Sequence, residues 1–233
     1  MDLSMKKNFS CIKLFIVAII NLAAFCQAQQ ESQLIKNLES GKSQTLITYG
    51  TSLTSHGAWV PQLQKLLNQR YPGKAKVINS GKSGMASNWG VKNLDERVIK
   101  KKPDTILIEF AMNDAVTRFK ISVEQAQKNL ENMIDRILKG NADCEIVLMV
   151  MNPTLGKANK TRPDLLKYYK MYRDVAKKRN FLLIDHYPNW KKVLDDKLKL
   201  FNKYVPDGIH PKAEGCKAVI TPQIVKSLGL EKK

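Results

Sequence analysis

Histidine and cysteine are scarce in this chain of 233 residues, which contains three histidines and four cysteines. They do not stand at the spacings with which Cys and His side chains bind a metal, so the sequence offers no candidate metal site. Only Cys144 and Cys216 lie beyond the first 28 residues. A disulfide would require their Cα atoms to lie within about 7 Å of each other. The sequence leaves open whether they pair or are two separate buried thiols.

Long hydrophobic runs are absent too. The longest apolar stretch, residues 14–25, has one polar interruption and is well short of the ~20 residues that span a bilayer. It follows three lysines and precedes a small residue, Ala28, as in a signal peptide that is removed on export. We therefore expect residues 1–28 to be a signal peptide and the mature protein to be periplasmic, secreted or at the cell surface, without stable membrane insertion. An uncleaved anchor and a lipoprotein site at Cys26 are the alternatives, and bulky Phe25 argues against the second.

Acidic side chains are outnumbered, with 39 Lys and Arg against 21 Asp and Glu. The first 28 residues hold three of the basic residues and one of the acidic ones, so the rest keeps a net charge of +16. Such an excess is typical of nucleic-acid-binding proteins. The lysines are scattered in short clusters, however, and an exported protein meets little nucleic acid. We interpret the charge as a solvated basic surface and expect no nucleic-acid partner, with attraction to an acidic polysaccharide as the alternative.

Internal repeats and low-complexity linkers are missing as well, so we expect residues 29–233 to form a single domain. Short apolar runs alternate with longer amphipathic ones. This pattern predicts strands at residues 45–49, 75–79, 105–111, 145–151 and 181–184. It predicts helices at residues 58–70, 89–101, 122–140, 162–179 and 212–228, the last bent at Pro222, with a polar loop at residues 152–161 and an irregular region at residues 187–190. Ser122, with Gln125 three residues later, begins the third helix in a capping-box pattern.

Strands that alternate with helices of this length predict a parallel sheet with helices on both faces. Ligands bind such sheets beyond the carboxyl ends of the strands. Four residues lie just past predicted strand ends, namely Ser52, Gly84, Asn113 and Asn152. Their placement predicts a functional site at that edge of the sheet.

A hydroxyl nucleophile needs a base, because a serine hydroxyl alone is unreactive. An imidazole steadied by a carboxylate supplies one, and Asp207-Gly208-Ile209-His210 offers both groups. The sequence therefore predicts that Ser52, His210 and Asp207 act together. His186 beside Asp185 is the rival base, but neighbouring strand residues point to opposite faces, so Asp185 cannot readily orient its neighbour.

In this combination the chain resembles the SGNH/GDSL hydrolases, a family of serine esterases and lipases. The family has four sequence blocks, named for a serine, a glycine, an asparagine and a histidine. Four such blocks occur here in order between Tyr49 and Pro211. The resemblance implies a flavodoxin-like α/β fold, a three-layer sandwich whose five-stranded parallel sheet has helices on both faces. It implies no cofactor.

The resemblance also implies roles for the matching residues. Ser52 matches the nucleophile, His210 its base and Asp207 the carboxylate that orients this base. The backbone N–H groups of Ser52 and Gly84 and the side-chain amide of Asn113 match the oxyanion hole.

Two positions depart from the family pattern. Thr51 stands where GDSL members have aspartate, and Ala111 stands where the third block usually begins with glycine. Neither position has a catalytic role in the family. The alanine raises the question of whether the backbone at Ala111 needs a glycine-only conformation.

Three further residues are candidates for substrate binding. His56 follows Ser52 by four residues and borders the acyl pocket in one interpretation, or caps and packs against the next helix in the other. The aromatic rings of Trp89 and Tyr187 could stack on a sugar, with core packing as the alternative.

These observations lead us to expect an exported serine esterase that acts on a small-molecule or glycan ester, with carbohydrate O-acetyl groups favoured. Export, basic charge and the absence of a long apolar stripe suit a polar glycan better than a lipid. A lysophospholipase or acyl-thioesterase of the same fold, and a non-catalytic glycan-binding protein, are the alternatives.

Overall fold

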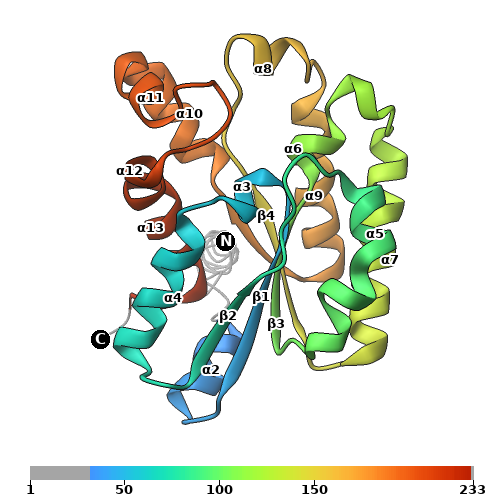
Figure 1. Ribbon diagram of the computed structural model, residues 1–233, viewed down its shortest axis with the longest axis vertical. Helices are drawn as coiled ribbons and strands as arrows, with labels where there is room; N and C mark the ends of the chain where they lie inside the picture. The colour runs from blue at the N-terminus through green and yellow to red at the C-terminus, as the bar shows by residue number, and fades with distance from the viewer. Residues whose placement is uncertain (1–31, 232–233) are drawn as a thin grey trace, which may run out of the picture. The chain divides into compact units, whose positions relative to one another are not determined.

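The computed structural model describes residues 32–231, so the expected signal peptide at residues 1–28 lies outside the described residues. Five parallel strands form one sheet in the order β2-β1-β3-β4-β5 (Figure 1). They are β1 (Gln44–Gly50), β2 (Ala75–Asn79), β3 (Thr105–Glu109), β4 (Glu145–Val150) and β5 (Leu182–Asp185). The predicted α/β fold with a five-stranded parallel sheet is confirmed.

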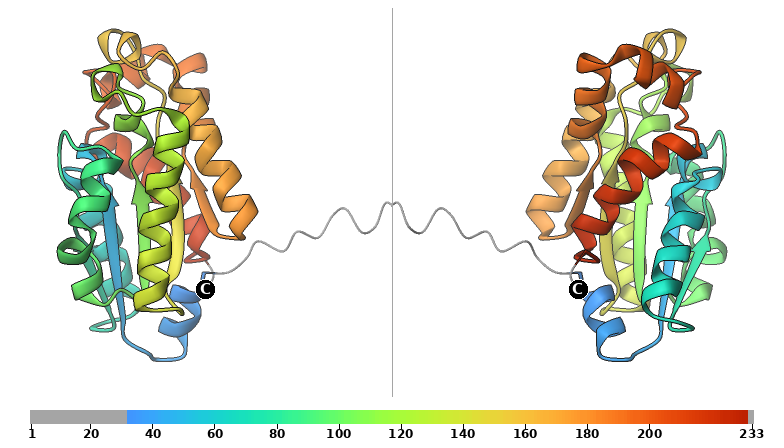
Figure 2. Two further views of the ribbon diagram at one scale, coloured as in Figure 1. Left: turned by 90° about the vertical axis from the view of Figure 1, so that its right-hand side faces the viewer. Right: turned by 90° about the vertical axis from the view of Figure 1, so that its left-hand side faces the viewer.

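Helices cover both faces of the sheet (Figures 1 and 2). On one face lie α4 (Trp59–Arg70) and α13 (Thr221–Leu228), which contact each other as well as β2 and β5. On the other face lie α5 (Ser87–Arg97), α7 (Val123–Gly140) and α9 (Leu165–Arg179). This arrangement leaves the carboxyl ends of the strands free to carry loops, as the alternating pattern predicted.

The hydrophobic core explains why these segments fold as they do. All five residues of β3 are buried, because this central strand is covered on both faces. Helix α7 buries one stripe of side chains at three- and four-residue steps, consisting of Ala126, Asn129, Leu130, Met133, Ile134 and Ile137. The predicted start of this helix is confirmed, because Ser122 Oγ accepts a hydrogen bond of 3.1 Å from the Gln125 N–H.

Shorter helices connect these layers. At the carboxyl end of the sheet lie α3 (Ser52–Ser55), α6 (Ala111–Asp114), the 3₁₀ turn at Thr117–Phe119, α8 (Lys157–Lys160), α10 (Tyr187–Asp196), α11 (Leu198–Tyr204) and α12 (Ala213–Gly215). A π-helical stretch, Cys216–Ile220, joins α12 to α13, and a 3₁₀ turn at Ile99–Lys101 ends α5. Pro222, where a bend was expected, lies in the first turn of α13, directly after the π-helical stretch.

The irregular region predicted at residues 187–190 is wrong, because these residues begin α10. Pro188 lies in its first turn, where a missing N–H costs no helical hydrogen bond. Trp190 is fully buried and packs edge-on against Phe201 with ring centroids 5.8 Å apart. A contact between two consecutive short helices therefore stabilises a segment whose local sequence favours a turn.

Helix α2 (Gln33–Glu39) has a start that no local pattern marks. Its first N–H groups are bound by Glu145, at the amino end of β4. The Glu145 carboxylate accepts from the Gln33 N–H at 2.8 Å, the Leu34 N–H at 3.0 Å and Ser32 Oγ at 2.7 Å. A capping residue more than a hundred positions away cannot be seen in the sequence around a helix.

The two cysteines beyond residue 28 do not pair. Cys144 and Cys216 are both buried free thiols, which decides between the alternatives left open by the sequence. Burial raises the pKa of Cys144 to about 12. Among residues 32–231 there is no helix long and apolar enough to cross a membrane.

Candidate active site

The turn after β1 presents Ser52 at the carboxyl edge of the sheet. Thr51 adopts an extended conformation and caps α3, its Oγ1 accepting from the Leu53 N–H at 3.2 Å. Ser52 is thus the first residue of a short helix, where backbone N–H groups have no partner within the helix. Ser52 therefore offers both its side-chain hydroxyl and a backbone N–H that has no partner within the helix.

The Ser52 hydroxyl meets an imidazole from the far end of the chain. Ser52 Oγ lies 2.8 Å from His210 Nε2, and His210 Nδ1 lies 2.6 Å from Asp207 Oδ2. A neutral imidazole with its proton on Nδ1 donates to Asp207 and leaves Nε2 to accept the hydroxyl proton. The structure therefore brings together the three residues that the sequence predicted to act as a unit.

The Asp207 carboxylate is held by its own loop. Its Oδ1 accepts from the backbone N–H groups of Ile209 at 3.0 Å and His210 at 2.8 Å. Partial burial opposes ionisation of Asp207, but these hydrogen bonds and that of the His210 ring outweigh it and hold the pKa of Asp207 below its ordinary value. The carboxylate is kept charged where it faces the imidazole.

A second loop fixes this one in place. Leu155 donates its N–H to the Gly208 carbonyl at 2.9 Å, and the Asn152 amide donates to the Ile209 carbonyl at 3.0 Å. Gly208 has φ +76°, and a Cβ there would lie 2.3 Å from the Leu155 carbonyl oxygen. Only glycine combines this backbone with such a close approach. Asn152, noted in the sequence only for its place past a strand end, thus helps to position His210.

Gly84 and Asn113 are linked across the edge of the sheet. The Asn113 side-chain amide donates one hydrogen bond, of 2.8 Å, to the carbonyl of Met85, the residue after Gly84. Gly84 is exposed with φ +71°. Its loop is fastened to α3, because Ser83 Oγ lies 2.8 Å from Ser55 Oγ. The second amide N–H of Asn113 and the N–H of Gly84 have no partner within the described part of the chain.

A sequence model of the GDSL-like lipase/acylhydrolase family matches residues 47–218, which include all of these groups. The chain belongs to this family. The resemblance to SGNH/GDSL hydrolases is therefore confirmed. No match was found among curated proteins.

Solved structures share the fold of this family member. They include an acetylxylan esterase from Geobacillus stearothermophilus, with a TM-score of 0.69 and 20% identity over 81% of this chain and 95% of that one. An α/β hydrolase from the metagenome of Lake Arreo, Spain, has a TM-score of 0.71 and 20% identity over 82% and 98%. A putative GDSL-like lipase from Parabacteroides merdae has a TM-score of 0.71 and 18% identity over 81% and 97%. At these identities the likeness supports the fold alone.

Ala111, which departs from the family's glycine, needs no special backbone. It is the first residue of α6 and is buried, and its φ is not positive. The strand predicted through residue 111 ends instead at Glu109, where the chain turns as the Phe110 N–H donates to the Tyr172 hydroxyl at 2.9 Å. Alanine is compatible with this helical turn.

A cavity of about 320 Å³ adjoins Ser52 in this acylhydrolase-family protein. It is lined by Ser52, Leu53, His56, Gly57, Asp207, His210, Pro211, Cys216 and Ile220. His56 thus lies at the cavity, where its Nδ1 is 3.0 Å from Ser83 Oγ. The described residues contain no group of three or more His, Cys, Asp or Glu side chains that could hold a metal ion.

The two aromatic candidates for substrate binding, Trp89 and Tyr187, lie outside this cavity. The ring of Trp89 packs 6.0 Å from that of Tyr49 and beneath the Arg97 guanidinium. The ring of Tyr187 packs 5.8 Å from that of Tyr169. Both rings are half-buried among protein side chains, and neither is among the residues that line the cavity.

The rival histidine is in no position to act as the base. His186 is fully buried, and neither of its ring nitrogens has a hydrogen-bond partner within residues 32–231. Burial lowers the pKa of His186 to about 3, which keeps the ring neutral. Asp185 points away to Arg173, with Asp185 Oδ2 2.7 Å from Arg173 Nε, as the alternation along a strand predicted.

Two buried carboxylates lie beneath the site, and one of them, Glu109, was not singled out from the sequence. Glu109 lies behind Thr51, and Asp114 follows Asn113 and accepts from the Ser87 N–H at 2.7 Å. Burial raises the pKa of each to about 7. A charged residue that ends an otherwise apolar strand was the available signal for Glu109.

The raised pKa of Asp114 predicts how stability depends on pH. Because the folded state holds this proton more tightly than the unfolded state, the contribution is present below about pH 4 and is lost as pH rises through about 7. We expect Asp114→Asn to remove this loss, so that its free energy of unfolding relative to wild type increases between pH 4 and pH 8, by roughly 1.4 kcal/mol for each pH unit that separates the pKa of Asp114 in the folded and unfolded states. Urea unfolding across this range measures the difference, and parallel pH profiles for the two proteins would contradict it.

Proposed function

We propose that this protein is an exported serine esterase that hydrolyses ester bonds, favouring carbohydrate O-acetyl groups. The observation that carries the proposal is the contact of 2.8 Å between Ser52 Oγ and His210 Nε2, with Asp207 Oδ2 2.6 Å behind the ring. Family membership supports acyl hydrolysis, and the signal-peptide pattern of residues 1–28 supports export.

The geometry suits a two-step reaction. In the first step the Ser52 hydroxyl attacks the ester carbonyl while His210 Nε2 takes its proton, and Asp207 stabilises the imidazolium that forms. Collapse of the tetrahedral intermediate breaks the ester bond, and the proton passes from His210 to the departing alcohol. In the second step a water molecule gives a proton to His210 and attacks the acyl-serine, which releases the acid and restores the Ser52 hydroxyl.

The negative charge of each tetrahedral intermediate needs donors at the carbonyl oxygen. Ser52 and Gly84 offer backbone N–H groups, and Asn113 offers the amide N–H that is not bound to Met85. The bond to the Met85 carbonyl fixes the orientation of the Asn113 amide before substrate arrives. One such donor contributes about 2.7–4 kcal/mol to the lowering of the barrier.

The size and exposure of the site support a small acyl group on a large polar alcohol. The cavity of about 320 Å³ lies at the lower end of the range for ligand pockets, which leaves little room for a long chain. The side chains of His210 and Asp207 are 45% and 52% exposed, so a bulky glycan can reach the nucleophile from solvent. One of the proteins that share the fold is an acetylxylan esterase.

A basic rim beside the site supports an acidic polysaccharide as partner. Two segments, residues 111–122 and 151–164, are joined where Thr117 donates its N–H to the Thr161 carbonyl at 3.1 Å. They carry five basic side chains, the basic rim: Arg118, Lys120, Lys157, Lys160 and Arg162. The two carboxylates in these segments do not neutralise the rim, because Asp114 is buried and Asp164 pairs with Lys167.

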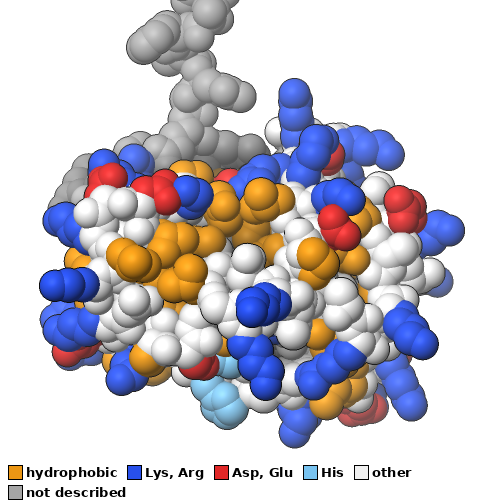
Figure 3. Space-filling view, turned by 90° about the horizontal axis from the view of Figure 1, so that it is seen from above, with side chains coloured by type: hydrophobic (Ala, Val, Ile, Leu, Met, Phe, Trp, Pro, Cys, Tyr) orange, Lys and Arg blue, Asp and Glu red, His pale blue; other side chains and the backbone are white. Residues whose placement is uncertain are grey.

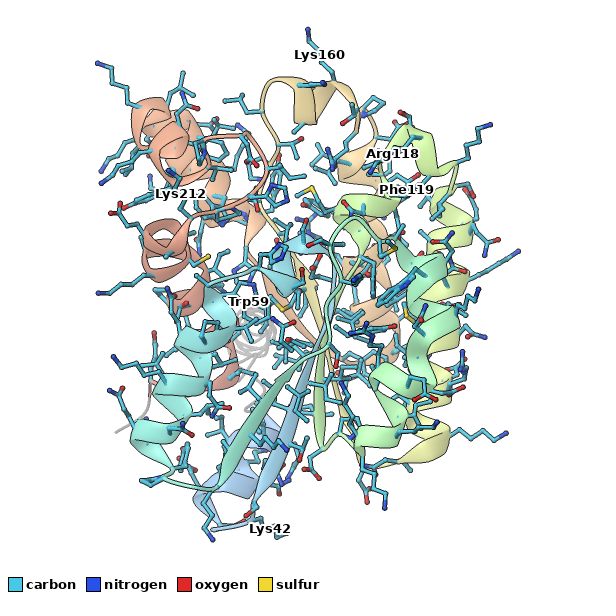
Figure 4. All side chains as sticks on the ribbon, viewed as in Figure 1. Lys42, Trp59, Arg118, Phe119, Lys160 and Lys212 are labelled. Carbon is cyan, nitrogen blue, oxygen red and sulfur yellow. The ribbon has the colours of Figure 1, made fainter. Side chains whose placement is uncertain are left out.

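Basic side chains predominate at the end of the molecule that carries the site. Figure 3 looks onto the end of the molecule where the strands terminate, and Lys and Arg side chains outnumber Asp and Glu there. Figure 4 shows Lys160 at α8 and Arg118 beside Phe119 at this end, with Lys42 at the opposite end. Arg162 reaches inward, and its Nε donates to the Met112 carbonyl at 2.8 Å, next to Asn113. The basic rim therefore adjoins the residues proposed to bind the oxyanion.

The nucleophile assignment has a direct test. A serine-reactive phosphonate should add one phosphonyl group to the wild-type protein, at Ser52 by peptide mass spectrometry. Ser52→Ala should fold normally, remain unlabelled and lose nearly all turnover of an acetyl ester, whereas Ser55→Ala, one helical turn away, should be labelled at Ser52. Unchanged turnover by Ser52→Ala would remove the assignment, and absence of labelling in the wild type would favour a non-catalytic glycan-binding protein.

Substrate preference separates the proposed esterase from a lysophospholipase or thioesterase. We expect kcat/KM for an acetyl ester to exceed that for a long-chain acyl ester by at least about tenfold, because each methylene that fails to fit costs about 1–3 kcal/mol. The measurement compares acetate release from acetylated polysaccharides with hydrolysis of long-chain acyl esters and thioesters. A strong long-chain preference would overturn the choice of substrate.

The basic rim predicts a preference for acidic glycans. Arg118→Gln and Lys160→Gln should each raise KM for an acetylated acidic polysaccharide by about twofold to fivefold at low salt, since one exposed ion pair contributes up to about 1 kcal/mol. KM for a neutral acetylated xylan should stay constant. Lys42→Gln, at the opposite end of the molecule, is the matched control. Equal effects of all three substitutions would show that only the net charge matters.

A further inference from the structure

Glu109 is a buried carboxylate that holds the turn bearing Ser52. It ends β3 opposite Gly50 in the register of the sheet and is 1% exposed. Its Oε1 accepts from the Thr51 N–H at 2.7 Å, from Thr51 Oγ1 at 3.0 Å and from Thr54 Oγ1 at 2.7 Å. These donors stand on both sides of Ser52, so one carboxylate fixes the residue before the nucleophile and the helical turn after it.

Thr51 links Glu109 to the start of α3 through hydrogen bonds. Its hydroxyl has a single proton, which it donates to Glu109, while its oxygen accepts from the Leu53 N–H at 3.2 Å. The cap of α3 is therefore oriented by Glu109 through Thr51. A change of the Thr51 χ1 rotamer, which moves Oγ1, would break the cap and the side-chain contact with Glu109 together.

Gly50 makes room for the carboxylate. A Cβ at residue 50 would lie 2.3 Å from Glu109 Oε1 and 2.4 Å from the Glu109 carbonyl oxygen. A larger residue would push the Glu109 side chain away from Thr51. The glycine, the threonine and the glutamate thus form one packed unit beneath the nucleophile.

We propose that Glu109 is a positioning residue for Ser52, and that it replaces from the neighbouring strand the carboxylate that GDSL members carry at the position of Thr51. This inference rests on the proposed function, since it concerns the orientation of the proposed nucleophile. It accounts for the departure at residue 51, because an aspartate there would bring a second buried carboxylate against Glu109. Such a pair of like charges without a counter-ion is strongly unfavourable.

The protonation state of Glu109 bears on this role. Burial raises the pKa of Glu109, hydrogen bonds from Thr54 and Thr51 oppose the rise, and the charge of Asp114 adds to it. Tyr169 and Tyr172 face the same region and stay protonated, because burial and, among other groups, the charge of Glu109 raise the pKa of each. The carboxylate form suits Oε1, which accepts three hydrogen bonds, and Oε2, which lies 3.1 Å from the donating Thr51 hydroxyl.

The test exchanges the carboxylate between the two strands. Glu109→Gln keeps the shape of the side chain and should lower kcat for an acetyl ester by about tenfold to a hundredfold, as small misplacements of reacting groups do, with KM changed less than about threefold. Thr51→Asp alone should lower kcat similarly. In the double variant Thr51→Asp with Glu109→Gln, kcat should recover by at least about tenfold over Glu109→Gln, which a merely structural role of Glu109 would not produce.

Glu145→Gln is the matched control. Glu145 likewise holds the start of a helix with its carboxylate, which accepts from two backbone N–H groups and a hydroxyl, but at the amino end of the sheet. This variant should lower the melting temperature and leave kcat unchanged. Thr54→Val, which removes one donor to Glu109, is the second variant should Glu109→Gln fail to fold, and it should lower kcat in the same direction.

Two readouts separate this inference from the proposed function. If the wild type is labelled at Ser52 by the phosphonate and Glu109→Gln is labelled at the same rate with wild-type kcat, the role of Glu109 is refuted and the esterase proposal stands. A double variant no more active than Glu109→Gln would also overturn the inference. If the wild type itself is neither labelled nor active, the proposed function fails whatever the variants do.

Discussion

The hydrogen bond between Ser52 and His210 joins residues 158 positions apart, and the remaining features of the site depend on it. A parallel sheet makes the contact feasible, because every strand delivers its carboxyl end to the same edge. The loop that carries His210 does not belong to a strand and has to be held from outside. Leu155 and Asn152 do so from the loop after β4, through the carbonyls of Gly208 and Ile209. The position of the His210 ring thus depends on hydrogen bonds between two loops.

Charge is distributed in two distinct ways around this contact. Behind Ser52 and the Asn113 turn, Glu109 and Asp114 are buried carboxylates that accept hydrogen bonds from backbone N–H groups. In front of it, Asp207 is half exposed and kept ionised by backbone N–H groups and the imidazole. Glu109 and Asp114 hold nearby backbone in place, and their burial makes ionisation of each less favourable. The exposed carboxylate of Asp207 instead supplies the negative charge that stabilises a protonated imidazole. The basic rim lies outside both groups, where solvent screens it and where it can meet only the part of a substrate beyond the ester.

Regular periodicity made the sheet and its long helices predictable, down to the hydrogen bond of Ser122 at the start of α7. Elements that depend on partners outside their own segment were not predictable. Helix α2 is capped by Glu145, and α10 is stabilised where Trp190 packs against Phe201. In the site, motif spacing located Ser52, Asp207 and His210, because their residue types follow from the chemistry. Glu109 escaped notice because a single charged residue at a strand end has no motif, and Trp89 and Tyr187 were candidates by type, whereas their rings pack against Tyr49 and Tyr169.

The most direct test of the account is a crystal structure of the protein after reaction with a small alkyl phosphonate, which mimics the tetrahedral intermediate. The account predicts phosphorus bonded to Ser52 Oγ, with His210 Nε2 within hydrogen-bond distance of the ester oxygens. It also predicts the phosphoryl oxygen within hydrogen-bond distance of the Gly84 N–H and the Asn113 amide. A phosphoryl oxygen that points away from both donors, or a phosphonyl group on any other side chain, would contradict it.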